Sequence, residues 1–148
     1  VAMLIEDREN VIFFLDSSCV IREVTRDGPA LIGLEQAELL VASQLSRLEV
    51  ARTLNRLRLE LKISGADVLA TEQAFAIFAR QIERIPLGDG VLELAARPTA
   101  IHLKSLDAIQ LATARIVRDA PTLGLVFATH DRRLAAAAVS FGFEVVGV

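Results

Sequence analysis

Short apolar runs alternate along this chain with longer segments in which apolar residues recur every three or four positions. The clearest run, Val-Ile-Phe-Phe-Leu at 11–15, is continuous and rich in β-branched and aromatic residues, as expected of a strand buried on both faces. Four other runs are strand candidates, the last two of them weaker: 125–128, 145–148, 39–42 and 82–87. Pro86 would place the run that contains it at a sheet edge.

The segments between these runs carry helical periodicity. Segment 44–62 has apolar residues at steps of four, three and four, which form one face of a helix. These residues are Val50, Leu54, Leu57 and Leu61. Four further helices are predicted over 66–84, 89–97, 106–119 and 132–141. Ser105 is a suitable N-cap for the third of these, and Gly142 a suitable residue after the end of the fourth.

Buried strands separated by helices predict an α/β fold with a central parallel sheet and helices on both faces. With 148 residues, 53% of them hydrophobic, the chain suits one domain with a full core. The single cysteine, Cys19, excludes an internal disulfide and a cysteine-based zinc site. No apolar run is long enough for a membrane span, and the charged residues within 1–10 are unlike a signal peptide, so we expect a cytoplasmic location.

The net charge of −3 argues against strong non-specific binding to polyanions, because that binding needs clustered cations. Any contact with nucleic acid should therefore be local. Fourteen of the 16 basic residues are arginine, whose planar side chain can bind a phosphate through two hydrogen bonds.

Two carboxylates follow predicted strands directly. Asp16 comes immediately after 11–15, and Asp131 lies three residues after 125–128. In parallel sheets, ligands bind outside the carboxyl ends of the strands. If these two strands are neighbours, their ends lie about 5 Å apart, and both acids could contact one Mg²⁺. The alternative is that each acid only caps the helix that follows it.

Two other acids complete the candidate set. Asp107 lies at the start of a predicted helix, where an acid also favours the helix dipole. Glu49 lies inside a helix, where no cap is needed, and its alternative role is that of an ordinary solvated acid. Two carboxylates 5 Å apart repel by roughly 3 kcal/mol at an effective dielectric of 20. Four converging acids would therefore need a bound cation or partial protonation.

Four segments, in this order and spacing, resemble a PIN domain, and most closely a VapC-type toxin ribonuclease. They are 14–18 (Phe-Leu-Asp-Ser-Ser), 46–50 (Ser-Arg-Leu-Glu-Val), 105–114 (Ser-Leu-Asp-Ala-Ile-Gln-Leu-Ala-Thr-Ala) and 128–134 (Ala-Thr-His-Asp-Arg-Arg-Leu). The resemblance runs from about Val11 to the end of the chain. It implies one PIN-like domain of three layers over 1–148, with a five-stranded parallel sheet of order 3-2-1-4-5 and an N-terminal extension at 1–10.

The resemblance also implies a function, that of a metal-dependent endoribonuclease acting as the toxin of a toxin–antitoxin pair. A Mg²⁺ or Mn²⁺ ion would activate a water that cleaves an RNA phosphodiester bond. The metal and catalytic residues implied are Asp16, Glu49, Asp107 and Asp131. Of these, Asp16 and Asp107 are the more direct ligands. Ser18 and Thr129 match hydroxyl positions that orient the carboxylates or a water.

Three arginines are candidates for RNA contact. Arg52 and Arg56 lie three and seven residues after Glu49, on the same helix face, and Arg132 lies beside the last acid. The alternative is a solvated basic surface.

Partners follow from the same resemblance: a cognate VapB-like antitoxin that presents a cation to the acidic pocket, an RNA substrate, and a second copy of the chain in a homodimer. No membrane partner is expected. An apolar stretch is predicted to contribute to the antitoxin groove or the homodimer face. It comprises Leu31, Ile32, Leu34, Leu39 and Leu40.

Two other functions stay open. The first is a non-catalytic binding module of PIN-like or receiver-like fold, whose acids only cap helices. The second, a phosphatase of the haloacid dehalogenase type, is disfavoured because position 18 holds serine where that family has a second aspartate.

Overall fold

The computed structural model describes residues 11–31, 33–119 and 124–148, so the extension expected at 1–10 lies outside the described residues. The elements follow in the order β1 (Val11–Leu15), α1 (Ser17–Thr25), η2 (Leu34–Gln36), β2 (Ala37–Ser43), α2 (Leu45–Leu59), α3 (Gly65–Phe78), η3 (Ala79–Gln81), β3 (Ile82–Ile85), α4 (Asp89–Ala95), α5 (Ser105–Asp119), β4 (Leu125–Ala128), α6 (Arg132–Ser140) and β5 (Glu144–Val146).

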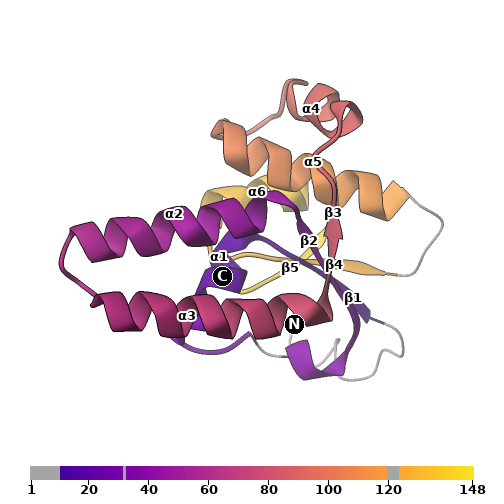
Figure 1. Cartoon of the computed structure of the whole chain (residues 1–148). Coiled ribbons are helices and arrows are strands. Elements are labelled where there is room, and N and C mark those ends of the chain that lie inside the picture. Colours follow the sequence, from indigo (N-terminus) through magenta and orange to yellow (C-terminus); the bar gives the residue numbers. More distant parts are fainter. Residues whose placement is uncertain (1–10, 32, 120–123) are drawn as a thin grey trace.

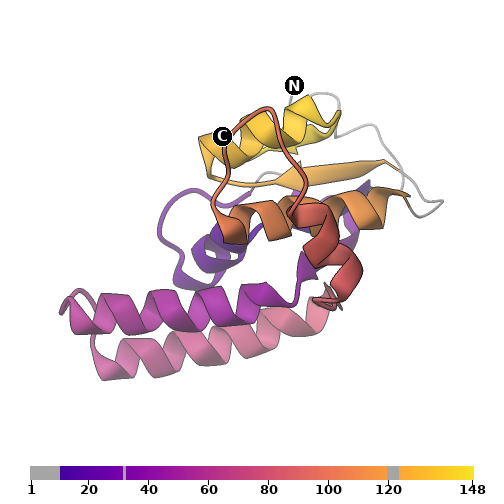
Figure 2. The same cartoon turned by 90° about the horizontal axis from the view of Figure 1, so that it is seen from above.

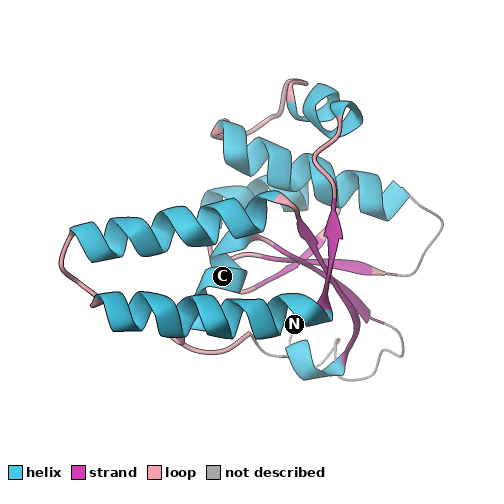
Figure 3. Cartoon of the chain, viewed as in Figure 1, coloured by secondary structure: helices cyan, strands magenta, loops and turns pink. Residues whose placement is uncertain are grey.

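The five strands form one parallel sheet of order β3-β2-β1-β4-β5, which confirms the predicted fold (Figure 3). β1 lies at the centre, where both of its edges are hydrogen-bonded to neighbours. Its register places Leu15 opposite Ala42 of β2 and Ala128 of β4. β3 is an edge strand, as Pro86 predicted.

Helices cover both faces of the sheet and create two apolar cores (Figures 1 and 2). Phe13 and Leu15 point into the core beneath α1, α2 and α3, whereas Ile12 and Phe14 point into the core beneath α5 and α6. Every residue of β1 is buried, as its continuous apolar run indicated. α4 packs on α5 at the outside of the second layer. No helix in the described ranges is long and apolar enough to cross a membrane.

α2 and α3 run side by side and project beyond the sheet (Figures 1 and 2). The apolar face predicted for segment 44–62 is correct at Val50 and Leu54 but wrong at Leu61, which is 91% exposed. Leu61 adopts a φ of 55° after the end of α2, where the chain turns towards α3. The single helix predicted over 66–84 is also wrong, because α3 ends at Phe78 and the chain then forms η3 and the edge strand β3.

The apolar stretch assigned to a partner surface faces the protein's own interior instead. Leu31 and Leu40 are buried in the first core, and Leu34 packs partly against it. Leu39 packs partly against the second core, and Ile32 lies outside the described residues. The predicted partner surface is therefore wrong for the buried Leu31 and Leu40, because helices cover both faces of the sheet, whereas Leu34 and Leu39 are only partly buried.

Backbone hydrogen bonds continue the sheet past the carboxyl ends of its strands. The N–H of Asp16 donates to Ala128 O at 3.0 Å, and the N–H of Thr129 donates to Val146 O at 3.0 Å. Gly147 then passes so close to this turn that a Cβ on it would lie 2.5 Å from Thr129 O. Its φ of +100° also disfavours any residue with a side chain. Glycine at this position thus lets the C-terminal segment support the turn after β4.

Replacing Gly147 by alanine should destabilise the protein more than the same change at Gly142. Gly142 has a similar φ of +81° but no atom within 4 Å of its would-be Cβ. Gly142→Ala should therefore lower the free energy of unfolding only by the cost of placing a side chain on a left-handed backbone, about 1–2 kcal/mol. Gly147→Ala should lower it further, because its Cβ also has to displace the backbone of Thr129. Urea unfolding of both variants measures the difference. Equal losses would show that the close approach has no energetic consequence.

Candidate active site

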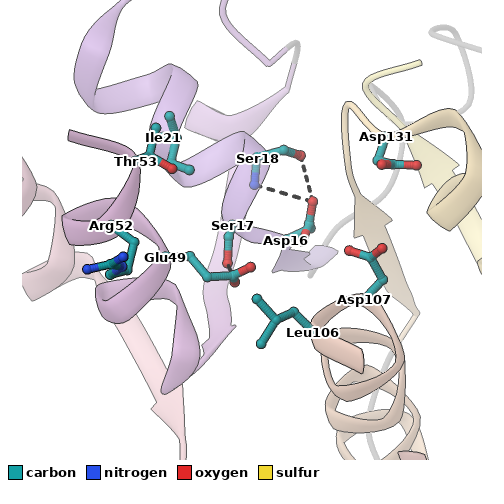
Figure 4. A pocket seen from close by; sticks show the side chains of 10 residues that line it. All are labelled: Asp16, Ser17, Ser18, Ile21, Glu49, Arg52, Thr53, Leu106, Asp107 and Asp131. Carbon is teal, nitrogen blue, oxygen red and sulfur yellow. Dashed lines mark hydrogen bonds between the residues drawn. The ribbon is translucent and has the colours of Figure 1, made fainter. Parts of the chain in front are cut away.

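All four acids of the sequence analysis line one open pocket of about 300 Å³ at the carboxyl ends of β1 and β4. Figure 4 shows Asp16 and Asp107 on facing sides of this pocket, with Glu49 entering from α2. Asp131 lies beyond Asp107, towards the start of α6. The remaining lining residues are Ser17, Ser18, Ile21, Arg52, Thr53 and Leu106.

Asp16 is held firmly through one of its carboxylate oxygens. Oδ2 accepts hydrogen bonds from Ser18 Oγ at 2.6 Å, from Thr129 Oγ1 at 2.9 Å and from the N–H of Ser18 at 3.3 Å. The last of these bonds makes Asp16 the N-cap of α1, as predicted. Oδ1 accepts none of these bonds. Asp16 is 5% exposed, and its position is set by the partly buried hydroxyl of Ser18 in α1 and the buried hydroxyl of Thr129 in the turn after β4.

Asp131 also caps a helix, α6, and lines the pocket. Its Oδ1 accepts from the N–H of Arg133 at 2.8 Å and of Leu134 at 2.9 Å, which caps α6 as predicted. The N–H of Asp131 donates to Thr129 Oγ1 at 3.0 Å, and the same hydroxyl donates to Asp16. Thr129 therefore links the two acids across the ends of β1 and β4.

Glu49 is tied to α1 and α5 and is not a freely solvated acid, so that alternative is wrong. Its Oε2 accepts a hydrogen bond from Ser17 Oγ and another from Gln110 Nε2, the latter at 2.7 Å. Gln110 Nε2 also donates to Ser17 Oγ at 2.5 Å. Glu49 lies half-buried on α2, and its Oε1 takes part in none of these bonds.

Asp107 reaches the pocket from the first turn of α5. This helix begins at Ser105 itself, so the N-cap predicted at that residue is wrong. The N–H of Ala108 donates to Lys104 O, which places Lys104 at the cap. The backbone of Lys104 in turn hydrogen-bonds the Asp107 carboxylate. Asp107 is half-buried, beside the exposed Leu106.

The electrostatics of the pocket disfavour ionisation of three of the acids. Burial raises the pKa of Asp16 above its usual value, although the bonds from Ser18 and Thr129 oppose this effect. Burial also raises the pKa of Glu49, with added repulsion from Asp16 and Asp107. Burial again comes first in raising the pKa of Asp107, followed by repulsion from Asp131 and Asp16. The repulsions show that these carboxylates act on one another across the pocket.

Carboxylate oxygens are the ligands that Mg²⁺ and Mn²⁺ prefer, so this donor set fits such an ion chemically. In Asp16, Glu49 and Asp131 one oxygen is hydrogen-bonded to the protein while the other is left out of those bonds. Within the described ranges, however, no three acidic, histidine or cysteine side chains lie close enough together to form a ready-made metal cage. Binding would therefore draw the acids inward from the walls of the pocket.

Only one of the candidate RNA-binding arginines lines the acidic pocket. Arg52 lines the acidic pocket, and its guanidinium points away from Asp16 and Asp107 (Figure 4). Arg56 lines a separate groove between α1, α2 and α3 and forms an ion pair with Glu60 at 3.5 Å. Arg132 is exposed at the start of α6 and does not line the pocket.

The sequence analysis missed two residues of this site. Ser17 and Gln110 form the hydrogen-bond network that holds Glu49, and both are buried. The only signal for either residue in the sequence is its closeness to a candidate acid. Ser17 follows Asp16 directly, and Gln110 lies one helical turn after Asp107. Cys19 is a small buried residue of the first core, and burial raises the pKa of its thiol far above the usual value.

Comparison with known proteins agrees with this geometry. The PIN domain family profile matches residues 13–140. A search among curated proteins gives no match. The fold is similar to that of VapBC2 from Rickettsia felis bound to a DNA fragment from its promoter, at 11% identity and a TM-score of 0.61, covering 90% of this chain and 96% of that one.

Two further solved structures have the same fold. A toxin–antitoxin complex from Klebsiella pneumoniae matches at 21% identity and a TM-score of 0.57, covering 82% of this chain and 89% of that one. PAE2754 from Pyrobaculum aerophilum matches at 20% identity and a TM-score of 0.61, covering 91% of this chain and 89% of that one. At these identities the likeness establishes the shared fold.

Removing the charge of Asp107 should stabilise the metal-free protein. A folded-state pKa above the unfolded one means that stability is lost as the pH rises through the raised value. Asp107→Asn should therefore raise the free energy of unfolding at pH 7 by a few tenths to about 1 kcal/mol, the range for partly exposed charges. The gain should vanish below the ordinary pKa of 3.8, where the wild-type carboxyl is protonated too.

Asp89→Asn is the matched control, because Asp89 occupies the first turn of α4 outside the pocket. Loss of its favourable interaction with the helix dipole should cost about 0.3–1 kcal/mol. Chemical unfolding in EDTA at pH 3 and pH 7 measures the free energy of unfolding of both variants under both conditions. If Asp107→Asn is destabilising at pH 7 like the control, Asp107 acts as a helix-terminal acid and not as a member of a repelling group.

Proposed function

The chain belongs to the PIN domain family, and from this membership and its acidic pocket we propose that it is a metal-dependent endoribonuclease, the toxin of a toxin–antitoxin pair. The observation that supports this function best is the set of four carboxylates from four separate elements lining one pocket. Capping accounts for Asp16 and Asp131, but it does not account for Glu49, which is held towards the pocket from inside a helix. A non-catalytic binding module would have no need of that arrangement.

In this proposal the carboxylates of Asp16, Glu49, Asp107 and Asp131 hold Mg²⁺ or Mn²⁺. The ion, when bound, makes a water nucleophilic at neutral pH and neutralises charge on the phosphoryl oxygens. Ser18 and Thr129 fix the carboxylate of Asp16 by donating to its Oδ2, and Oδ1 takes no part in these two bonds. Thr129 also accepts a hydrogen bond from the backbone N–H of Asp131 and thereby fixes the position of Asp131 relative to Asp16.

The open shape of the pocket suits a polymeric substrate, whose backbone has to enter and leave the site. Arg52 lines the pocket on the side of α2 and would receive a phosphate beside the scissile bond. Arg56 and Arg132 lie farther out and would contact flanking nucleotides.

The partner in this proposal is an antitoxin that presents a guanidinium or ammonium group to the acids. Two similar structures are described as a VapBC assembly and a toxin–antitoxin complex, which supports a partner of this kind. A cation from a protein would relieve the same repulsion that a metal ion relieves. A homodimer and a cytoplasmic location stay predictions.

RNA cleavage should require both a divalent cation and the central acids. EDTA should abolish cleavage, and Mn²⁺ should restore it. Asp16→Asn should lower the cleavage rate by more than about 100-fold, because several kcal/mol of transition-state stabilisation would be lost. The measurement uses a labelled structured RNA, with circular dichroism to show that the variant is folded.

Asp89→Asn serves again as the control and should cleave as the wild type does. Mn²⁺ should also raise the melting temperature of the wild type and raise that of Asp16→Asn less. Undiminished cleavage by folded Asp16→Asn protein would refute the proposed nuclease mechanism.

Replacing Arg52 should weaken RNA binding and leave the chemical step largely intact. Arg52→Ala should raise the KM for RNA with little change in kcat. It should also reduce the slope of log affinity against log salt by about 0.7, the value for one contact to a single strand. Arg58→Ala is the matched control, because Arg58 lies on the same helix but donates to Asn55 and does not line the pocket. An equal effect of both changes would mean that RNA affinity falls because the protein has lost a positive charge, and not because Arg52 contacts the RNA at the pocket.

A further inference from the structure

Gln110 stands out as a buried polar side chain that no part of the fold requires. It is 0% exposed, and its neighbours along α5 include the core residues Leu111 and Ala114. A leucine or methionine would fill the same volume without burying an amide. A buried amide is unfavourable unless its hydrogen bonds are made, so its presence points to a specific partner.

That partner is the carboxylate of Glu49. Gln110 Nε2 lies within hydrogen-bonding distance of two acceptors, Glu49 Oε2 at 2.7 Å and Ser17 Oγ at 2.5 Å. The hydroxyl of Ser17 in turn donates to the same oxygen of Glu49. Three helices, α1, α2 and α5, are thereby joined at one carboxylate oxygen.

The other end of the amide shows how strongly this orientation is preferred. Gln110 Oε1 is buried and has no hydrogen-bond partner among the described residues. Turning the amide over would place Oε1 against the carboxylate oxygen of Glu49 and against a hydroxyl whose hydrogen is already donated. The orphaned acceptor is therefore the consequence of directing the amide nitrogen, and not the oxygen, towards Glu49 and Ser17.

We propose that Gln110 is a positioning residue that, together with Ser17, occupies Oε2 of Glu49 and so presents only Oε1 to the acidic pocket. This inference rests on the proposed metal-dependent nuclease function, to which it adds the residue that orients one of the four acids. Without the amide, the Glu49 side chain would be free to rotate about its own bonds and to meet the pocket through either oxygen or neither.

Gln110→Met tests this inference, because it keeps the side-chain length and removes only the polar groups. It should weaken Mn²⁺ binding, measured by calorimetry with the metal alone, by about tenfold to 100-fold, the usual effect of losing a group that orients a ligand. It should lower kcat for RNA cleavage and leave the KM for RNA unchanged. Gln110→Asn, which is too short to reach Glu49, should behave alike and replaces the methionine variant if that protein does not fold.

Thr113→Val is the matched control, because Thr113 is equally buried one turn along α5 but donates only to Ile109 O of its own helix. It should bind Mn²⁺ and cleave RNA as the wild type does. In a Glu49→Gln background, Gln110→Met should have no further effect on Mn²⁺ affinity. Additive losses in the double variant would overturn the inference, because they would mean that Gln110 does not act through Glu49.

A crystal structure of metal-free Gln110→Met separates this inference from the proposed function. Rotation of the Glu49 carboxylate away from Ser17 would support the positioning role even if the wild type bound no Mn²⁺ and cleaved no RNA. A Glu49 carboxylate that keeps its wild-type place would overturn the inference even if the protein proved to be a nuclease.

Discussion

Mutual repulsion among carboxylates at one edge of a parallel sheet is the constraint on which this site depends. Parallel strands all end at the same edge, so the acids that follow β1 and β4 have to meet there. α2 and α5 bring Glu49 and Asp107 to the same place. Burial raises the pKa values of Asp16, Glu49 and Asp107, and repulsion from neighbouring carboxylates adds to this effect for Glu49 and Asp107. Such an arrangement lowers stability unless a cation compensates it.

The protein holds these acids apart by engaging one oxygen of a carboxylate and leaving the other out of the bond. Backbone N–H groups do this for Asp131, and hydroxyls of Ser18 and Thr129 do it for Asp16. Helix capping therefore does not exclude a place in the pocket, because the bonds that cap α1 and α6 use one carboxylate oxygen of each acid and leave the other out. Glu49 has no helix end to cap, so the bonds from Ser17 and Gln110 replace those that a helix end would supply.

Patterns that depend on local chemistry could be predicted from the sequence. The buried central strand followed from the apolar run at 11–15, and the caps at Asp16 and Asp131 from their places after strands. The strand order came from family resemblance. The network around Gln110 could not be predicted, since a glutamine at that helix position is equally consistent with a surface residue. The role of Leu31 and Leu40 was misjudged because burial depends on which helices cover β2, which their own segment does not specify.

If these four acids hold divalent metal together, anomalous diffraction from a crystal soaked in Mn²⁺ should locate the ion in the pocket. We expect one or more strong anomalous peaks within the pocket, bounded by oxygens of Asp16, Glu49, Asp107 and Asp131. The hydrogen bonds to Oδ2 of Asp16 and Oε2 of Glu49 should persist when the metal is bound. A pocket without a peak, in crystals that bind Mn²⁺ elsewhere, would mean that these acids do not form a metal site.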